Sequence, residues 1–74
     1  MTTASPTTTL PLILNGAPHS AVASTLADLV TALGHDPAAV ATAVNGEFVP
    51  RARRASTKLA PGDNIEIVSP RQGG

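Results

Sequence analysis

The chain has 74 residues and a formal net charge of zero, with five basic and five acidic side chains. This length makes one small domain, and the balanced charge lacks the basic excess that is typical of nucleic-acid-binding proteins. Because the chain has no cysteine, neither a disulfide framework nor a cysteine-ligated metal site is expected. Phe48 is the single aromatic residue, so the core must be built from aliphatic side chains.

The two ends of the chain differ in composition from the middle. No apolar stretch approaches the roughly 20 residues that span a bilayer, and residues 1–9 lack the basic segment of a secretory signal. These threonine-rich residues are expected to form a flexible N-terminal extension. We therefore expect a cytoplasmic protein with no membrane association, a folded domain over residues 10–69 and a flexible tail over residues 70–74.

A hairpin is expected first. Alternating apolar residues from Leu10 to Leu14 predict a strand. Pro11 cannot donate a hydrogen bond to a neighbouring strand, so it belongs near the strand's start or on an open edge. Asn15-Gly16 is typical of a type I′ hairpin turn, because both residues tolerate positive φ. A second strand over residues 17–22 returns from it, and its Pro18 favours an edge position.

One helix is expected next. Its start is indicated by Thr25 and Asp28, which fit an N-terminal capping pattern, and its end by Gly34. Apolar residues at i, i+3, i+4 and i+7 place one stripe on its surface: Leu26, Leu29, Val30 and Leu33. A helix of about two turns is too short to be stable alone and must pack on a sheet.

The second half of the chain predicts a further hairpin. Residues 35–37 form a turn, and residues 40–44 are small or β-branched, as in a strand that is buried on both faces if it is central. Asn45-Gly46 is the second hairpin turn, and the returning run ends at Pro50.

The last part of the chain alternates loops and short strands. The polar and basic residues 51–57 are expected to form a loop, and residues 58–60 a short pairing segment before a type II turn at Pro61-Gly62. Residues 64–69 form the last strand, with Ile65 and Ile67 on one face. The order β-β-α-β-(β)-β predicts an α+β ubiquitin-like β-grasp fold, with one main helix across a mixed four- to five-stranded sheet.

Conventional catalytic constellations are missing from the sequence. His19 and His35 have no partners at ligand spacing and are typical of surface or turn histidines, and the acidic residues are scattered. No glycine-rich phosphate loop is present. We therefore expect that the protein is not an enzyme and that it binds no cofactor or metal itself.

The basic residues suggest contacts with a partner. Arg51, Arg53 and Arg54 form the single charge cluster, which fits either a solvated loop or a surface that steers an acidic partner. Arg71 lies near the end of the chain. It either orients the tail in a partner's cleft or is a solvated side chain.

The chain ends in Gly73-Gly74, directly after a predicted strand. Glycine has no Cβ, so such an arm can enter a narrow active site and present the Gly74 carboxylate, with Gly73 as a flexible joint. ATP could activate that carboxylate by adenylation inside another enzyme, for later attack by a sulfur nucleophile. The alternative is an ordinary frayed terminus.

Several short motifs in the last 35 or so residues resemble the ThiS family of thiamine-pathway sulfur carriers. In chain order they are Ala43-Val44-Asn45-Gly46, Val49-Pro50-Arg51, Lys58-Leu59, Gly62-Asp63, Ile65-Glu66-Ile67-Val68 and Gly73-Gly74. The predicted helix and first hairpin agree with the family more loosely. The resemblance departs in two places: family members often have an aromatic residue shortly after the Pro-Arg pair, where Arg53-Arg54-Ala55 stands here, and residues 1–9 extend beyond the usual start.

The resemblance implies a β-grasp carrier that holds sulfur covalently as a thiocarboxylate on Gly74. It implies adenylation of Gly74 with ATP by an E1-like adenylyltransferase of the ThiF type, a persulfide-bearing sulfur donor, and delivery to a ThiG-type thiazole synthase. Two related roles stay open, the small subunit of molybdopterin synthase and a ubiquitin-like protein modifier. The short segment from Gly34 to Val40 favours the thiamine carrier over the molybdopterin subunit, and a β-grasp binding module with an inert tail is a third alternative.

Overall fold

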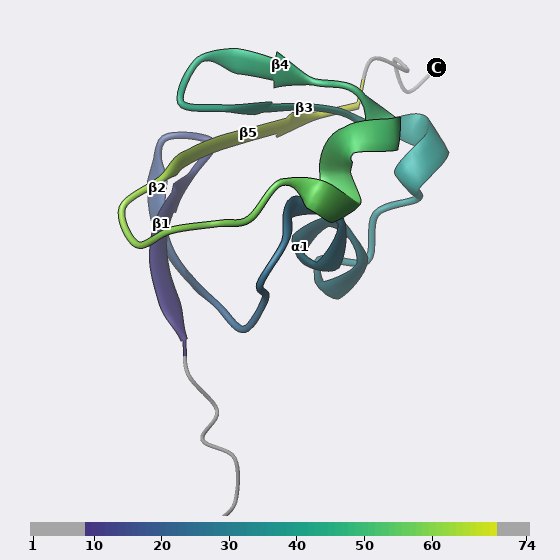
Figure 1. Ribbon diagram of the computed structural model, residues 1–74. Helices are drawn as coiled ribbons and strands as arrows, with labels where there is room; N and C mark the ends of the chain where they lie inside the picture. Colours follow the sequence, from purple (N-terminus) through teal and green to yellow (C-terminus); the bar gives the residue numbers. More distant parts are fainter. Residues whose placement is uncertain (1–8, 70–74) are drawn as a thin grey trace, which may run out of the picture.

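The computed structural model describes residues 9–69, in which one helix crosses a five-stranded sheet (Figure 1). The regular elements are β1 (Leu10–Leu14), β2 (Ala17–Ala21), α1 (Leu26–Ala32), β3 (Ala41–Val44), β4 (Glu47–Val49) and β5 (Asn64–Val68). Two 3₁₀ helices, η1 (Pro37–Ala39) and η2 (Arg51–Ser56), lie in the connections. The main helix and the strands expected over residues 10–14, 17–22, 40–44, 47–49 and 64–69 are therefore present, and their bounds differ from the expected ones by a residue or two.

The strands lie in the order β2-β1-β5-β3-β4. The β1–β5 pair is parallel and the other three pairs are antiparallel. The last strand thus joins the two hairpins at the centre of a mixed sheet, which is the ubiquitin-like β-grasp arrangement expected from the element order. Pro18 lies on the edge strand β2, as predicted, and Pro11 lies near the start of β1, before the parallel pairing with β5 begins at Ile13.

Both hairpin turns use positive φ at an Asn-Gly pair. The φ angles are 51° and 85° at Asn15-Gly16, and 52° and 85° at Asn45-Gly46. Positive φ at both central positions defines the type I′ turn, whose twist suits an antiparallel pair. The two predicted hairpins are confirmed.

The helix begins and ends where the sequence indicated. The Thr25 side chain accepts a hydrogen bond from the Asp28 backbone N–H at 3.1 Å and so caps the first turn. Gly34, at φ 82°, follows the last helical residues and provides the left-handed conformation that commonly ends a helix. Leu26, Leu29 and Val30 are buried on the face that the stripe predicted, and Leu33 is partly buried beside them.

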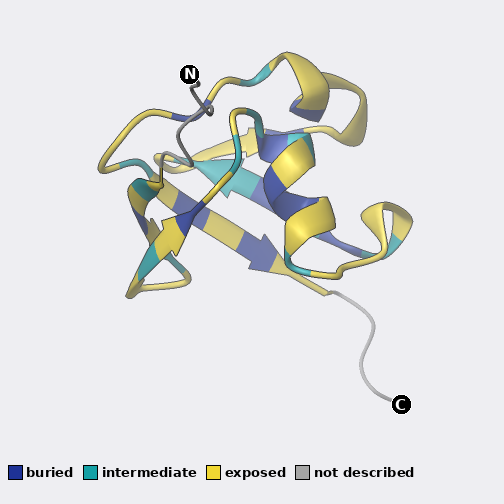
Figure 2. Cartoon of the chain, turned by 90° about the horizontal axis from the view of Figure 1, so that it is seen from below, coloured by how far each residue is buried: buried dark blue, intermediate teal, exposed yellow. Residues whose placement is uncertain are grey.

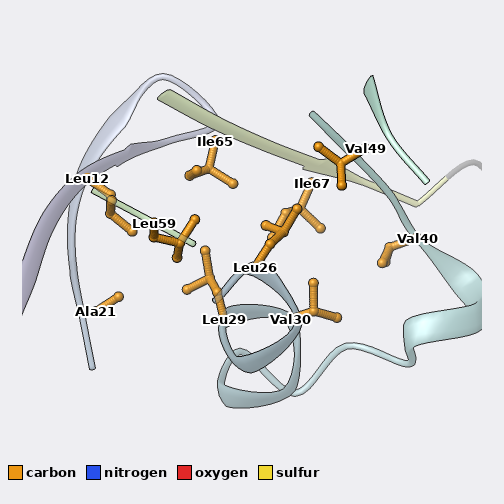
Figure 3. Packing of buried hydrophobic residues seen from close by; sticks show 10 residues of the cluster. All are labelled: Leu12, Ala21, Leu26, Leu29, Val30, Val40, Val49, Leu59, Ile65 and Ile67. Carbon is orange, nitrogen blue, oxygen red and sulfur yellow. The ribbon is translucent and has the colours of Figure 1, made fainter. Parts of the chain in front are cut away.

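An aliphatic core fills the space between α1 and the sheet (Figure 3). Strand residues Leu12, Ile65 and Ile67 face the helix stripe from the sheet side. The buried cluster consists of Leu12, Ala21, Leu26, Leu29, Val30, Val40, Val49, Leu59, Ile65 and Ile67. Phe48 is 69 % exposed, so the one aromatic side chain is not part of this core.

Two sequence predictions about the second half are wrong. Residues 51–56 form the 3₁₀ helix η2 instead of a loop, with a backbone hydrogen bond of 2.8 Å from Arg53 N–H to Pro50 C=O at its start. Strand β3 is buried on one face only: Thr42 is buried, whereas Ala41 and Ala43 are half-buried. The reason is that α1 covers a single face of the sheet (Figure 1).

The predicted pairing segment at residues 58–60 is reduced to one bridge. Lys58 pairs with Thr25, and backbone hydrogen bonds of 2.9 Å join Leu26 N–H to Thr57 C=O and Leu59 N–H to Ser24 C=O. These contacts hold the start of α1 against the chain that leads into β5. The following turn has Gly62 at φ 86°, as the type II turn predicted there requires.

Candidate functional site

The candidate site is the end of β5, because this strand leads into the C-terminal segment. Ile65 and Ile67 point into the core and are 0 % and 5 % exposed, while Glu66 and Val68 are exposed on the opposite face (Figure 2). This alternation fixes which way the strand faces up to its last residue. Pro70 to Gly74, and with them Arg71, Gly73 and Gly74, lie outside the described residues.

Strand β3 supports one side of the end of β5. The antiparallel register continues to the pair Ala41 and Val68, so β5 is paired on this side to its last residue. On the other side the parallel pairing with β1 stops at Leu14 and Ile65. Beyond it, the Asn15 side chain exchanges two hydrogen bonds with the backbone of Ile67.

The outer face of the sheet beside this strand end is largely apolar, and the charged side chain of Glu66 lies on it as well. Phe48 is 69 % exposed and Val68 is 56 % exposed, and a shallow hollow lies between β3, β4 and β5. Ala43 pairs with Phe48, and Ala41 pairs with Val68, which places small side chains between the two large ones. We call Ala41, Ala43, Phe48 and Val68 the outer patch.

The arginine cluster separates into exposed and buried members. Arg51 and Arg53 are exposed on η2, directly after β4, and Arg53 borders a hollow that Phe48 also lines. Arg53 is therefore accessible to a partner that covers the outer patch, whereas Arg51 borders a hollow beside α1.

Arg54 is 4 % exposed and holds the fold together internally. Its guanidinium donates hydrogen bonds to Thr42 Oγ1 (3.1 Å), Pro37 O (2.8 Å) and Val40 O (2.7 Å). Arg54 thus ties η2 to η1 and β3, and its expected role as a partner contact is corrected to a structural one. Two adjacent arginines carry no signal in the sequence that separates the buried residue from the exposed one.

The histidines do not form part of a site. His19 lies half-buried on the edge strand β2 and His35 lies exposed in the turn after α1. Among residues 9–69, no three or more His, Cys, Asp or Glu side chains gather in a way that could hold a metal ion. Within the same residues, α1 and the shorter helices fall far below the length and apolarity needed to cross a membrane.

Comparison with protein families gives a match over residues 12–74 to the model of the ThiS family. The chain belongs to the ThiS family. The match includes most of the first hairpin, all of the second, α1 and the terminal Gly-Gly, and it begins after the threonine-rich extension. The division at residues 9 and 70 that the composition suggested stays a prediction.

Solved structures agree with this family assignment. The crystal structure of the thiamine biosynthesis protein ThiS of Geobacter metallireducens is 28 % identical, with a TM-score of 0.73, and the alignment covers 88 % of this chain and 100 % of that one. A solution NMR structure of a thiamine biosynthesis protein of the same organism has a TM-score of 0.74 at 28 % identity and 88 % coverage of both chains. No curated protein matches the sequence significantly.

Proposed function

We propose that this chain is a sulfur carrier for the thiazole of thiamine, with the sulfur held as a thiocarboxylate on Gly74. The observation that carries the proposal is the ThiS family match, which runs through Gly74 and includes the strand that leads to it. In this role the protein is a co-substrate that works in the cytoplasm with partner enzymes, and it performs no catalysis itself.

The chemistry needs only the C-terminal carboxylate from this chain. A Gly74 carboxylate oxygen attacks the α-phosphorus of ATP, pyrophosphate leaves, and an acyl-adenylate forms. The terminal sulfur of a persulfide donor then attacks the Gly74 carbonyl carbon and AMP leaves, which gives an acyl disulfide. A thiol reductant cleaves that S–S bond with two electrons and leaves the thiocarboxylate. ATP is bound by the E1-like, ThiF-type adenylyltransferase.

The reach of the tail limits where that enzyme can dock. Residues 70–74 span at most about 17 Å when fully extended. An enzyme that holds Gly74 in its active site must therefore cover the surface around the end of β5. The outer patch lies at this place, and its exposed Phe48 is an aromatic side chain of the kind enriched at protein interfaces, with the exposed Val68 adding to the apolar surface.

The charges near the patch suggest the character of the partner. Arg51 and Arg53 are exposed on η2 and would speed the approach of an acidic surface. Arg71, in the tail, is proposed to orient the tail in the same partner. We infer that the adenylyltransferase presents an apolar surface with an acidic rim, and that the ThiG-type thiazole synthase meets the same strand end after sulfur loading.

Intact-mass spectrometry tests the proposal. The purified chain is incubated with ATP, a ThiF-type enzyme and a persulfide donor under reducing conditions, and a mass increase equal to the exchange of one oxygen for sulfur is expected at Gly74. A chain that stays unmodified with all components present would refute the proposal. Attachment of Gly74 to lysines of other proteins would instead identify a ubiquitin-like modifier. Rescue of a deletion strain by thiamine alone separates the thiamine role from that of the molybdopterin synthase subunit.

A further inference from the structure

The side chain of Asn15 extends the sheet at the point where β1 ends. The parallel ladder between β1 and β5 reaches a hydrogen bond of 2.9 Å from Asn15 N–H to Ile65 C=O, and the chain then turns away through Asn15-Gly16. In place of the next strand residue, Asn15 Nδ2 donates to Ile67 O at 3.1 Å, and Asn15 Oδ1 accepts from Ile67 N–H at 2.9 Å. The amide group therefore acts as a peptide group would in a longer β1.

These two hydrogen bonds satisfy a part of β5 that β3 cannot reach. Backbone groups along a strand alternate between its two neighbours. Since Ile65 C=O points to β1, the N–H and C=O of Ile67 point to the same side. Without Asn15 they would face a gap in the sheet, and the end of β5 would be held by β3 alone.

We propose that Asn15 is a positioning residue for sulfur loading, because it fixes the strand end from which residues 70–74 reach the adenylating enzyme. This inference rests on the proposed function. Strand ends open at low free-energy cost, and the loss of two hydrogen bonds raises the fraction of time for which the end of β5 is open. Only the closed form keeps Val68, and with it the point where the tail begins, beside the rest of the outer patch, so opening lowers the population that is competent to bind.

The second Asn-Gly turn offers a matched control. Asn45 has nearly the same φ as Asn15, 52° against 51°, and also bonds to β5, but at the strand's start. Its Oδ1 accepts from Asn64 N–H at 2.9 Å and its Nδ2 donates to Asp63 Oδ1 at 3.1 Å. The substitutions Asn15→Gly and Asn45→Gly both keep positive φ accessible and both remove a side-chain amide, so they differ in which end of β5 they release.

The experiment measures backbone amide exchange by NMR and the steady-state kinetics of adenylation by a ThiF-type enzyme. In Asn15→Gly the Ile67 amide is expected to exchange about tenfold faster than in the wild type. The KM for the carrier should rise roughly threefold or more with kcat unchanged. Asn45→Gly should keep the wild-type values of KM and Ile67 exchange. A purely structural role would speed Ile67 exchange in Asn15→Gly and leave its KM equal to that of Asn45→Gly.

The conservative variant Asn15→Asp adds a second test and serves alone if Asn15→Gly does not fold. It keeps an acceptor for Ile67 N–H and loses the donor to Ile67 O. Its KM should therefore exceed that of Asn45→Gly and, where Asn15→Gly also folds, should lie below that of Asn15→Gly. Equal KM values for the Asn15 and Asn45 variants, or a loss confined to kcat, would overturn the positioning role while the carrier function stands. Failure of the wild-type chain to become adenylated would refute the proposed function itself.

Discussion

Arg53 and Arg54 are adjacent residues of the same type, and the fold gives them opposite surroundings. Arg53 is exposed on η2, whereas the Arg54 guanidinium is buried among the acceptors of Pro37, Val40 and Thr42. Thr42 Oγ1 in turn donates to Val49 O at 2.8 Å, so the network reaches β4. A buried cation is tolerated here because oxygen acceptors replace its water.

We expect Arg54→Ala to destabilise the protein by about 2–4 kcal/mol, because it removes charge-assisted hydrogen bonds and leaves buried acceptors unpaired. Arg53→Ala is the matched control and should stay within about 0.5 kcal/mol of the wild type. Urea unfolding of the two variants measures the difference. Equal stabilities would show that the buried network contributes nothing.

Phe48 is a large apolar residue that is exposed and takes no part in the core. We expect Phe48→Asp to leave the free energy of unfolding nearly unchanged and to lower kcat/KM for adenylation about tenfold or more, as the loss of an interface anchor does. Val22→Asp is a suitable control, since Val22 is 59 % exposed in the segment after the opposite edge strand β2. If both variants are adenylated as well as the wild type, the outer patch is not the docking surface.

At the scale of elements, β5 serves two purposes, and the alternation of its side chains assigns each purpose to one face of the sheet. Its inward residues Ile65 and Ile67 complete the core, and its outward residue Val68 belongs to the outer patch. The strand pairs with β1 and β3, one from each hairpin. A tail attached to this strand is therefore attached to the central strand of the sheet, which has a neighbour on each side.

Shortening a side chain is expected to have different consequences on the two faces of β5. Ile65→Ala should cost about 2–5 kcal/mol, because it leaves a cavity in a fully buried position. Val68→Ala should change stability little and should raise the KM for adenylation. Thermal unfolding and adenylation kinetics on the same samples separate the two effects, and a stability loss at Val68 as large as that at Ile65 would contradict the division of faces.

At the scale of the whole molecule, we expect the domain to fold without either end of the chain. All ten residues of the buried cluster lie between Leu12 and Ile67. Because β1 and β5 are parallel neighbours, the start of β1 and the end of β5 lie at opposite ends of the sheet (Figure 1). The point where residues 1–8 join the domain is therefore at the opposite end of the sheet from the end of β5.

We expect deletion of Gly73 and Gly74 to keep the midpoint of thermal unfolding and to abolish thiocarboxylation. Deletion of residues 2–8 is the control, and it should preserve both properties, since the family match begins at residue 12. Circular dichroism and intact-mass spectrometry make the two measurements. A truncated tail that still accepts sulfur would show that the modified group lies elsewhere.

The sequence by itself determined the elements and the candidate tail, because local features encode them: alternation for the strands, a capped apolar stripe for α1, and Asn-Gly pairs for both hairpins. The ThiS-like motifs indicated the family from the same residues. Only the tertiary structure decided that residues 51–56 form a helix, that Arg54 is buried and Phe48 exposed, and that Asn15 holds Ile67. These features depend on contacts between residues far apart in the chain, 52 positions in the case of Asn15 and Ile67, and no local pattern specifies them.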